Sequence, residues 1–235
     1  MKIGNQNRDN AMEVIRTEKL EKIYQENGVP VHALRGIDLS IKQGEFLVIA
    51  GPSGSGKTTL LNLIGALDNP SKGKVFLEGE DISLKSKNQL SQLRLHKIGF
   101  VFQAYNLIPV LSALENIEFT MMLRGISESE REKRALAVMK ELGIDELAHK
   151  RPNEMSGGQQ QRVAVARAIV NNPSIVLADE PTANLDTETG ATLLDLMEKM
   201  NSEKEITFIF SSHDPQVIDR AKRLLNLRDG RIDGG

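Results

Sequence analysis

The residues best suited to chemistry lie in a glycine-rich stretch that joins an apolar run to an amphipathic one. Phe46 to Ala50 has the composition of a buried strand, and the sequence GPSGSGKT follows it from Gly51 to Thr58. Apolar residues then recur at helical spacing from Leu60 onward, so the stretch lies between a strand and a helix. In such a loop, backbone N–H groups surround a β-phosphate, Lys57 reaches the β- and γ-oxygens, and the hydroxyl of Thr58 ligates Mg²⁺. The pattern therefore predicts a binding site for the phosphates of a nucleotide.

Two adjacent carboxylates follow a second apolar run. The run Ile175 to Asp179 ends in an aspartate, and Glu180 comes next. At a strand end, Asp179 would hold Mg²⁺ through its water shell, while Glu180 would point differently and polarise an attacking water. The alternative is a solvated acidic pair that caps the strand. The presence of Lys57 upstream favours the functional interpretation.

Three further side chains are candidates because of where they lie relative to apolar runs. His213 follows the run Ile206 to Phe210, and Gln103 follows the run Ile98 to Phe102. The histidine could bond to the γ-phosphate or have a purely structural role, and the glutamine amide could ligate Mg²⁺ or orient water. Tyr24 could stack on a nucleotide base, although a half-buried tyrosine of a strand has the same pattern. All three interpretations depend on the phosphate site predicted at the glycine-rich loop.

The stretch MSGGQQQRVAVARA opens a predicted helix with two adjacent glycines, Gly157 and Gly158. Each glycine inside a helix costs roughly 1 kcal/mol relative to alanine, so a simple helix does not account for them. Ser156 and Gln159 have the spacing of a capping box, which would merely tolerate the glycines in the first turn. Alternatively, an anion approaches this helix N-terminus too closely for a Cβ atom. The second interpretation requires a phosphate nearby.

These candidate residues require a sheet whose strands end at one edge. Strand-like and helical runs alternate, which is typical of a mostly parallel sheet with its ligand site at the carboxyl ends of the strands. From residue 113 to 171 the pattern is helical with breaks at glycine or proline, which indicates a helical lobe inserted at about 106–171. The other predicted strands are Val14 to Tyr24, Val31 to Ile41, Lys74 to Gly79 and Leu224 to Leu227. The predicted helices include Leu114 to Leu123, Glu128 to Leu142, Gly157 to Val170 and Thr187 to Met200.

The composition limits the classes of partner. The chain has 235 residues, a formal net charge of −2 and no cysteine, so it offers no overall basic field for nucleic acid, no disulfide and no cysteine-ligated metal. No run approaches the roughly 18 apolar residues of a membrane span. The polar start predicts a flexible tail over residues 1–12, followed by one domain over residues 13–235. If the protein works at a membrane, another chain supplies the span.

Taken together, these motifs resemble those of the ATPase subunit of ABC transporters over essentially the whole chain. The matching segments are Gly51 to Thr58 for the Walker A loop, Gln103 for the Q-loop, Met155 to Gln159 for the signature, Ile175 to Glu180 for the Walker B strand, Ala183 to Asp186 for the D-loop, His213 for the switch histidine and Tyr24 for the adenine-stacking aromatic. Met155 stands where the family usually has leucine, and Ala183-Asn184 precede the Leu-Asp pair of the D-loop. Neither departure removes a functional group, so the resemblance implies an active enzyme that hydrolyses ATP.

The resemblance also implies a fold, two cofactors and a role for each motif. The fold is α/β, a P-loop NTPase core with a mostly parallel sheet, an N-terminal antiparallel β subdomain and an inserted helical subdomain. ATP and Mg²⁺ are the implied cofactors. The implied ATP-binding residues are Tyr24, Gly51, Pro52, Ser53, Gly54, Ser55, Gly56, Lys57, Thr58 and Thr59. The implied catalytic residues are Glu180, His213, Gln103 and Lys57. The implied metal ligands are Thr58, Gln103 and Asp179. In this family two copies pair head to tail, so the signature residues Ser156, Gly157, Gly158 and Gln159 would face ATP held by the second copy, and Asp186 would belong to the D-loop.

The segment VFQAYNLIPVLSALENIEF, Val101 to Phe119, resembles the lipoprotein-release and macrolide-exporter branch, whose ATPases drive an integral membrane permease. The resemblance thus implies a cytoplasmic homodimer that is peripheral on the inner face of the cytoplasmic membrane through its permease, with no nucleic-acid partner. Leu107 to Leu111 is predicted to line a groove for a short permease helix, or else to be a buried connection between lobes.

Two alternatives to a transport ATPase stay open. One is the ATPase of a regulatory membrane complex that signals to a cell-wall hydrolase, which the sequence of the ATPase alone separates poorly from a transporter. The other is a soluble ABC ATPase for cofactor assembly. A DNA-repair relative is disfavoured because Lys57 and Asp179 are only about 120 residues apart, with no sustained heptads between them.

Overall fold

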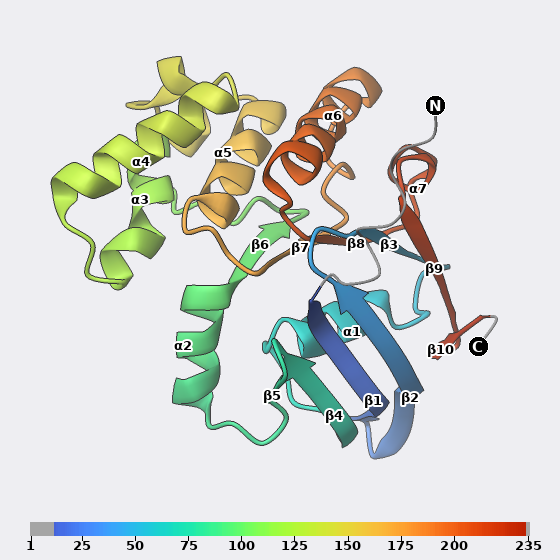
Figure 1. Cartoon of the computed structure of the whole chain (residues 1–235). Coiled ribbons are helices and arrows are strands. Elements are labelled where there is room, and N and C mark those ends of the chain that lie inside the picture. Colours follow the sequence, from blue (N-terminus) through green and yellow to red (C-terminus); the bar gives the residue numbers. More distant parts are fainter. Residues whose placement is uncertain (1–11, 234–235) are drawn as a thin grey trace, which may run out of the picture.

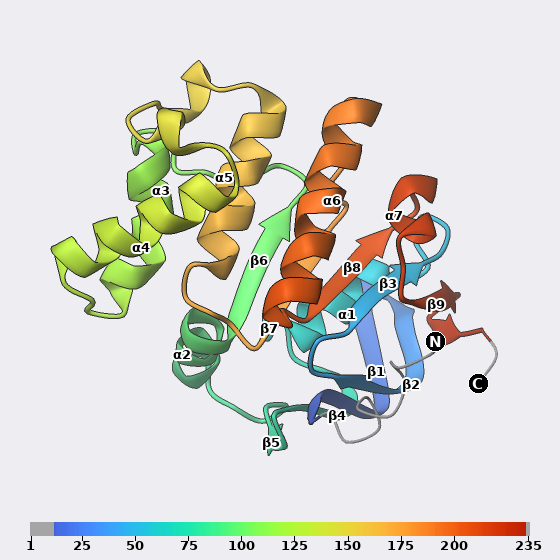
Figure 2. The same ribbon diagram turned by 45° about the horizontal axis from the view of Figure 1, so that its top comes forward.

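Two β-sheets meet at the glycine-rich loop, and helices pack around them (Figure 1, Figure 2). The computed structural model describes residues 12–233. The tail expected over residues 1–12 lies outside this range except for Met12, whose side chain is exposed.

The larger sheet has six strands in the order β10-β9-β3-β8-β7-β6. Its strands pair in parallel, except that β10 runs antiparallel to β9. Both faces of the central strands are covered by other elements. Every residue of β3 and β8 is therefore buried. The strands are β3 Phe46–Ala50, β6 Ile98–Phe102, β7 Ile175–Asp179, β8 Phe208–Ser212, β9 Arg223–Arg228 and β10 Arg231–Ile232.

The smaller sheet is antiparallel, in the order β2-β1-β4-β5. Its first hairpin turns at Asn27 and Gly28, which both have positive φ, as a tight hairpin with the right-handed twist of the strands requires. The strands are β1 Glu13–Glu26, β2 Val29–Lys42, β4 Lys72–Leu77 and β5 Glu80–Asp81. The predicted N-terminal antiparallel sheet is therefore confirmed, as is the α/β class.

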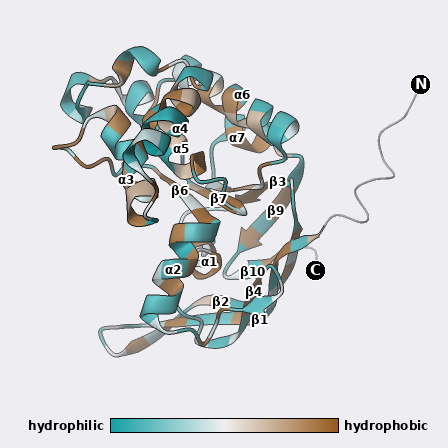
Figure 3. Ribbon diagram, turned by 60° about the vertical axis from the view of Figure 1, so that its left-hand side comes forward, coloured by the Kyte–Doolittle hydropathy of each residue, from teal (hydrophilic) through white to brown (hydrophobic). Residues whose placement is uncertain are grey.

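Most of the helices lie between β6 and β7 in the sequence or pack on the larger sheet. They are α1 Lys57–Ile64, α2 Lys87–Lys97, α3 Ala113–Leu123, α4 Glu128–Glu141, α5 Gly157–Ile169, α6 Thr187–Lys204 and α7 Pro215–Asp219, with short 3-10 turns at Asp145–Leu147 and Pro152–Glu154. Helices α3, α4 and α5 pack together beside β6 (Figure 1). Figure 3 shows hydrophobic and hydrophilic residues alternating along these helices, as expected for helices with one buried and one solvated face.

The two faces of the larger sheet belong to different cores. Phe46 and Phe210 pack on one face, with ring centroids 4.6 Å apart and ring planes tilted by 43°, in a cluster with α5 and α6. Ile49 and Ile209 lie on the other face, in a cluster with α1 and the antiparallel sheet. Successive residues of a strand face alternate cores. Adjacent polar residues at the end of a strand therefore also lie on opposite faces of the sheet.

Three longer elements show how the structure differs from the sequence prediction, and the short elements β5, α7 and β10 were not predicted either. Strand β8 begins at Phe208 rather than Ile206. The buried side chain of Asn201 donates a hydrogen bond to the Ile206 carbonyl at 2.8 Å, so this carbonyl pairs with a side chain instead of a strand. Helix α6 continues four residues past the predicted Met200. Helix α2 was not predicted, because only Leu90 and Leu93 of its residues are buried and its apolar periodicity is correspondingly weak.

Candidate active site

The carboxyl ends of three neighbouring parallel strands bring the predicted residues to one edge of the larger sheet. Ala50 of β3 lies in register with Ser212 of β8, and Ser211 lies in register with Asp179 of β7. The glycine-rich loop, Glu180 and His213 begin directly after these positions. The site therefore forms at the carboxyl edge, as the pattern of apolar runs predicts.

The glycine-rich loop wraps around the ammonium group of Lys57. This residue is only 8% exposed, and its Nζ donates to the carbonyl oxygens of Gly51 at 2.7 Å and Pro52 at 3.1 Å. Gly56 has a φ of 104°, and a Cβ there would come within 2.6 Å of the Ala33 carbonyl oxygen. No side chain caps the N-terminus of α1, so its first N–H groups stay available to an anion.

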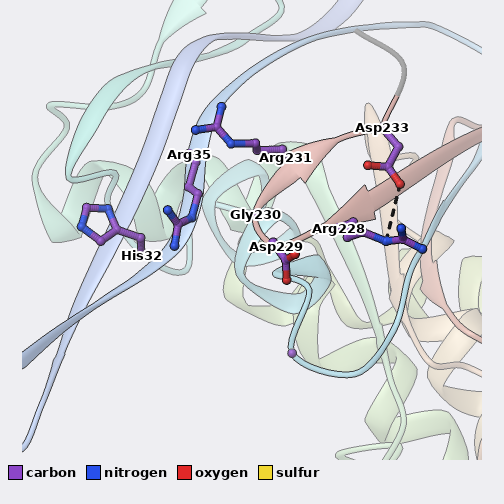
Figure 4. A pocket seen from close by; sticks show the side chains of 8 residues that line it. His32, Arg35, Arg228, Asp229, Gly230, Arg231 and Asp233 are labelled. Atoms are coloured by element: carbon purple, nitrogen blue, oxygen red, sulfur yellow. Dashed lines mark ion pairs between the residues drawn. The ribbon is translucent and has the colours of Figure 1, made fainter.

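A turn near the C-terminus supports this loop. Gly230, between β9 and β10, donates its N–H to the carbonyl of Ser55 at 3.0 Å and accepts from the N–H of Arg35 at 2.9 Å. Beside the turn is a hollow of about 560 Å³, which is lined in part by Arg35 and Arg231 and in which Arg228 pairs with Asp233 at 3.8 Å (Figure 4). The sequence RDGR indicates only a turn, because no local pattern connects it to the distant glycine-rich loop.

Two of the predicted metal ligands lie side by side. The Thr58 hydroxyl at the start of α1 donates to Oδ1 of Asp179 at 3.3 Å. A hydroxyl and a carboxylate are oxygen ligands of the kind that Mg²⁺ prefers, and Mg²⁺ keeps several waters, so two protein ligands fit such an ion. In residues 12–233, no group of three or more His, Cys, Asp or Glu side chains forms a metal cage.

Glu180 is held by the end of β8. Its Oε2 accepts from the Ser212 hydroxyl at 2.8 Å, its Oε1 lies 2.6 Å from Nδ1 of His213, and its N–H donates to the Ser211 carbonyl at 2.9 Å. Its φ of 46° lies in the left-handed region, which is uncommon for a residue other than glycine. The predicted Glu180 and His213 are thus brought together, whereas Ser212 was not predicted.

Gln103 follows β6, next to the strand that carries Asp179. Phe102 and Asp179 are in register, so Gln103 lies at the same edge, with an exposed side chain. Its carbonyl accepts from Nδ2 of Asn184 at 2.8 Å. Asn184, which the sequence marks only as a departure from the family pattern, therefore links the Q-loop to the D-loop.

Tyr24 lies on β1 within a polar cluster that the sequence did not reveal. Its hydroxyl donates to Oδ2 of Asp68 at 3.0 Å, and Nζ of Lys22 lies 4.9 Å from the ring centroid. Burial, followed by the contact with Asp68, raises the pKa of Tyr24. The phenol therefore stays neutral near pH 7, and polar contacts hold its ring near the end of β1.

The signature residues begin α5, and they contact other loops of the same chain. Ser156 accepts from the N–H of Gln159 at 3.3 Å, and Oε1 of Gln159 accepts from the N–H of Ser156 at 2.9 Å, which completes the predicted capping box. A Cβ on Gly157 would lie 2.8 Å from the hydroxyl of Tyr105, and a Cβ on Gly158 would overlap the Thr189 side chain. A side chain at position 158 would thus crowd Thr189 within one chain, whereas the long side chain of Tyr105 could move away from one at position 157. The sequence indicated neither contact. No hydrogen bond among the described residues joins the signature to the glycine-rich loop.

The glycine-rich loop around Lys57, the Thr58–Asp179 pair and the Glu180–His213 pair lie at one sheet edge, the arrangement expected of a nucleotide-hydrolysing cassette. Residues 34–183 match the family model described as ABC transporter. The chain belongs to this family and is an ABC-type ATPase, the ATP-binding subunit of an ABC transporter. Within residues 12–233, none of the helices has the length and apolar character needed to cross a membrane.

Several relatives cover nearly the whole chain. An uncharacterised ABC transporter ATP-binding protein of Thermotoga maritima is 49% identical over 213 residues, which are 91% of each chain. The cassette MJ0796 of Methanocaldococcus jannaschii has been solved as a dimer, and it superposes with a TM-score of 0.86 at 43% identity, covering 93% of this chain and 96% of that one. The macrolide export ATP-binding/permease protein MacB of Syntrophobacter fumaroxidans is 42% identical over 94% of this chain, which is 31% of MacB.

Proposed function

We propose that this chain hydrolyses ATP in a head-to-tail homodimer and thereby powers a membrane permease of the lipoprotein-release or macrolide-export type. The observation that carries the hydrolytic part is the position of Glu180 at the same sheet edge as Lys57 and Asp179. The similarity to MacB over its ATPase portion supports the export branch. A second MJ0796 structure, which contains ADP and phosphate in a post-hydrolysis dimer, supports both nucleotide turnover and pairing.

Each residue of the site has a role that its position allows. Lys57 exchanges its two carbonyl acceptors for the β- and γ-oxygens, which are better acceptors because they are charged. Thr58 and Asp179 hold Mg²⁺ together with the amide of Gln103, and the ion neutralises phosphate charge when it is bound. Glu180 orients and polarises the attacking water, and His213 bonds to the γ-phosphate. Tyr24 provides an aromatic face for the adenine.

The signature completes the site of the second copy. The hydroxyl of Ser156 accepts from Gln159, and its own proton is still available to a phosphate. The free N–H groups of Gly157 and Gly158 lie in the first turn of α5, where a helix attracts anions. Asp186 caps α6 and fixes Thr189 against Gly158, which places the D-loop directly beside the signature.

The permease contact is proposed at a groove of about 450 Å³ between α2, β6, α3 and α5. Leu67, Phe100, Phe119 and Leu123 supply much of its apolar lining. Of the run expected to line it, Ile108 does so, but Leu107 packs against the core of the helical lobe. A short amphipathic permease helix in this groove would attach the chain to the cytoplasmic face of the membrane.

The test of the hydrolytic role is Glu180→Gln, which keeps the shape of the side chain but removes its charge. We expect turnover to fall by orders of magnitude while ATP still binds, so that an ATP-bound dimer accumulates on size exclusion in the presence of Mg²⁺. Glu203→Gln, at the exposed end of α6, is the matched control and should behave like the wild type. Normal turnover by purified Glu180→Gln protein would show that another group activates the water.

A further inference from the structure

Two adjacent serines end β8, and their side chains lie on opposite faces of the sheet. Ser211 shares the face of Ile209, and Ser212 shares the face of Phe210, because residues of a strand alternate. Both serines are completely buried. The Ser211 hydroxyl has no partner among the described residues, whereas the Ser212 hydroxyl donates to Oε2 of Glu180 at 2.8 Å. The two hydroxyls therefore differ in a contact that substitution can test.

The orientation of the Ser212 hydroxyl is fixed by its surroundings. It accepts from the N–H of Asp214 at 3.1 Å, and since a hydroxyl has only one proton, that proton is directed to Glu180. Asp214 is itself held, because its Oδ2 accepts from the Thr182 hydroxyl at 2.7 Å. Thr182 follows Glu180 by two residues, so these contacts close a ring between the loops after β7 and β8.

His213 contacts the other carboxylate oxygen from a more open position. Its side chain is 72% exposed, whereas Ser212 is completely buried. In the proposed function His213 turns to the γ-phosphate, and its contact with Oε1 of Glu180 is then exchanged. The bond from Ser212 to Oε2 is partly buried and does not have to break in that step.

We propose that Ser212 is the positioning residue of the hydrolytic carboxylate, holding Oε2 of Glu180 so that Oε1 faces the attacking water. This inference rests on the role proposed for Glu180. Ser212 is completely buried and its proton goes to Glu180, so its hydroxyl should contribute to turnover and not to ATP affinity. A carboxylate that has lost this bond can rotate, and fewer of its orientations present a lone pair to the water.

The first experiment compares Ser212→Ala with Ser211→Ala in steady-state ATPase assays. Loss of a hydrogen bond to a charged group predicts a fall in kcat of roughly 10- to 100-fold for Ser212→Ala, with ATP affinity within about twofold of wild type. Ser211→Ala removes an unpartnered buried hydroxyl from the same strand and should leave both quantities unchanged. Ser212→Thr, which keeps the hydroxyl, should recover most of the turnover. If Ser212→Ala does not fold, Ser212→Cys provides a similar volume with a much weaker donor.

The second experiment asks whether Ser212 acts through Glu180. In single-turnover assays, Ser212→Ala should have no further effect in a Glu180→Gln background, because the carboxylate it positions is already gone. Equal losses in both backgrounds would overturn the inference and identify a purely structural effect. A normal kcat for Ser212→Ala beside an inactive Glu180→Gln would overturn it as well, while the role of Glu180 would stand. High turnover of Glu180→Gln alone would remove the proposed function on which the inference rests.

Discussion

Thr189 of α6 occupies the space that a side chain at position 158 of the signature would need. A Cβ atom on Gly158 would overlap the Cγ2 methyl of Thr189. Thr189 is fixed there because its N–H and its hydroxyl both donate to Asp186, at 2.9 and 2.7 Å. The second signature glycine therefore avoids crowding within one chain, independently of any phosphate that a dimer brings to it.

This packing predicts the behaviour of Gly158→Ala and of its rescue. The substitution should lower the free energy of unfolding by about 1–3 kcal/mol, because overpacking forces α5 and α6 apart. Thr189→Ser removes only the obstructing methyl and keeps both bonds to Asp186, so the double variant should recover most of that loss. Urea unfolding without nucleotide measures both effects. A Gly158→Ala protein as stable as the wild type would show that the contact with Thr189 does not require glycine.

The double variant also separates packing from phosphate binding. Once Thr189→Ser has made room within the chain for the methyl group that Gly158→Ala introduces, any remaining defect in ATP-dependent dimerisation belongs to the approach of the second copy. We expect such a defect if the N–H groups of Gly157 and Gly158 receive a phosphate at close range. Normal dimerisation of the stable double variant would assign the glycine at position 158 to folding alone.

Arg167 connects the signature helix to the loop that follows Gln103. Its guanidinium donates to the carbonyls of Asn106 at 2.6 Å and Tyr105 at 2.9 Å, two residues with positive φ. Burial lowers the pKa of Arg167, yet an arginine stays protonated at neutral pH. The carbonyl dipoles of this strained loop therefore stabilise the partly buried charge.

We predict that Arg167→Met costs about 2–3 kcal/mol of unfolding free energy, because two charge-assisted bonds are lost. Arg167→Lys should be no better, since it keeps a buried charge but cannot reach both carbonyls with planar geometry. Arg134→Met, which breaks an exposed pair with Glu130 on α4, is the control and should change stability by less than about 1 kcal/mol. Equal, small effects of all three substitutions would contradict the structural role of Arg167.

Asp68 contributes to the decrease in the free energy of unfolding at low pH, and a substitution can remove this contribution. Burial alone would raise its pKa, but hydrogen bonds from Lys22, the N–H of Asn69 and Tyr24 outweigh this and leave the pKa below its usual 3.8. A carboxylate with a lowered folded-state pKa contributes stability above its unfolded-state pKa and loses it as pH falls through the folded-state value.

Asp68→Asn should therefore unfold more easily than the wild type at pH 5–7, and the difference should shrink as the pH falls below about 4. We expect a difference of about 1 kcal/mol at most, because a third of the side chain is exposed and solvent screens the ion pair with Lys22. Chemical unfolding across this pH range measures it. A difference that grows toward low pH would have the wrong sign for this assignment.

The sequence predicts the sheet edge well because apolar runs report strands directly. Phe46–Ala50 and Ile175–Asp179 are observed with the predicted bounds, and the residues after them reach the site because parallel strands end at one edge. The hairpin at Asn27 is equally local. Such features depend on neighbours in the chain, and for this reason the sequence is sufficient.

Contacts between distant segments could not be predicted in this way. The close packing of Thr189 against Gly158 lies between two helices, and the bond from Ser212 to Glu180 lies between the ends of two strands. A serine before a histidine, or a threonine in a first helical turn, is compatible with many different neighbours, and periodicity does not choose among them. Leu107 shows the same limit, since an apolar run does not reveal which of its members face the core.

The groove between α2 and the helical lobe can be tested with side chains that the fold does not need. Leu123 lines it and is 56% exposed, whereas Leu136 on α4 is 37% exposed and is not part of the lining. Both leucines lie on the surface of the lobe, so Leu123→Glu and Leu136→Glu form a matched pair. Leu107 would be a poor choice, because a charge there would disturb the core.

We predict that Leu123→Glu abolishes association with membranes that contain the permease, while Leu136→Glu binds normally. A permease helix with its apolar face in the groove would have to bury the new carboxylate, which costs several kcal/mol unless the charge is paired. Basal ATPase activity and unfolding free energy should stay close to wild type for both variants, since neither leucine contacts the site. Co-sedimentation with permease-containing membranes, against membranes without it, measures the association. Normal binding by folded Leu123→Glu protein would place the permease contact on another face.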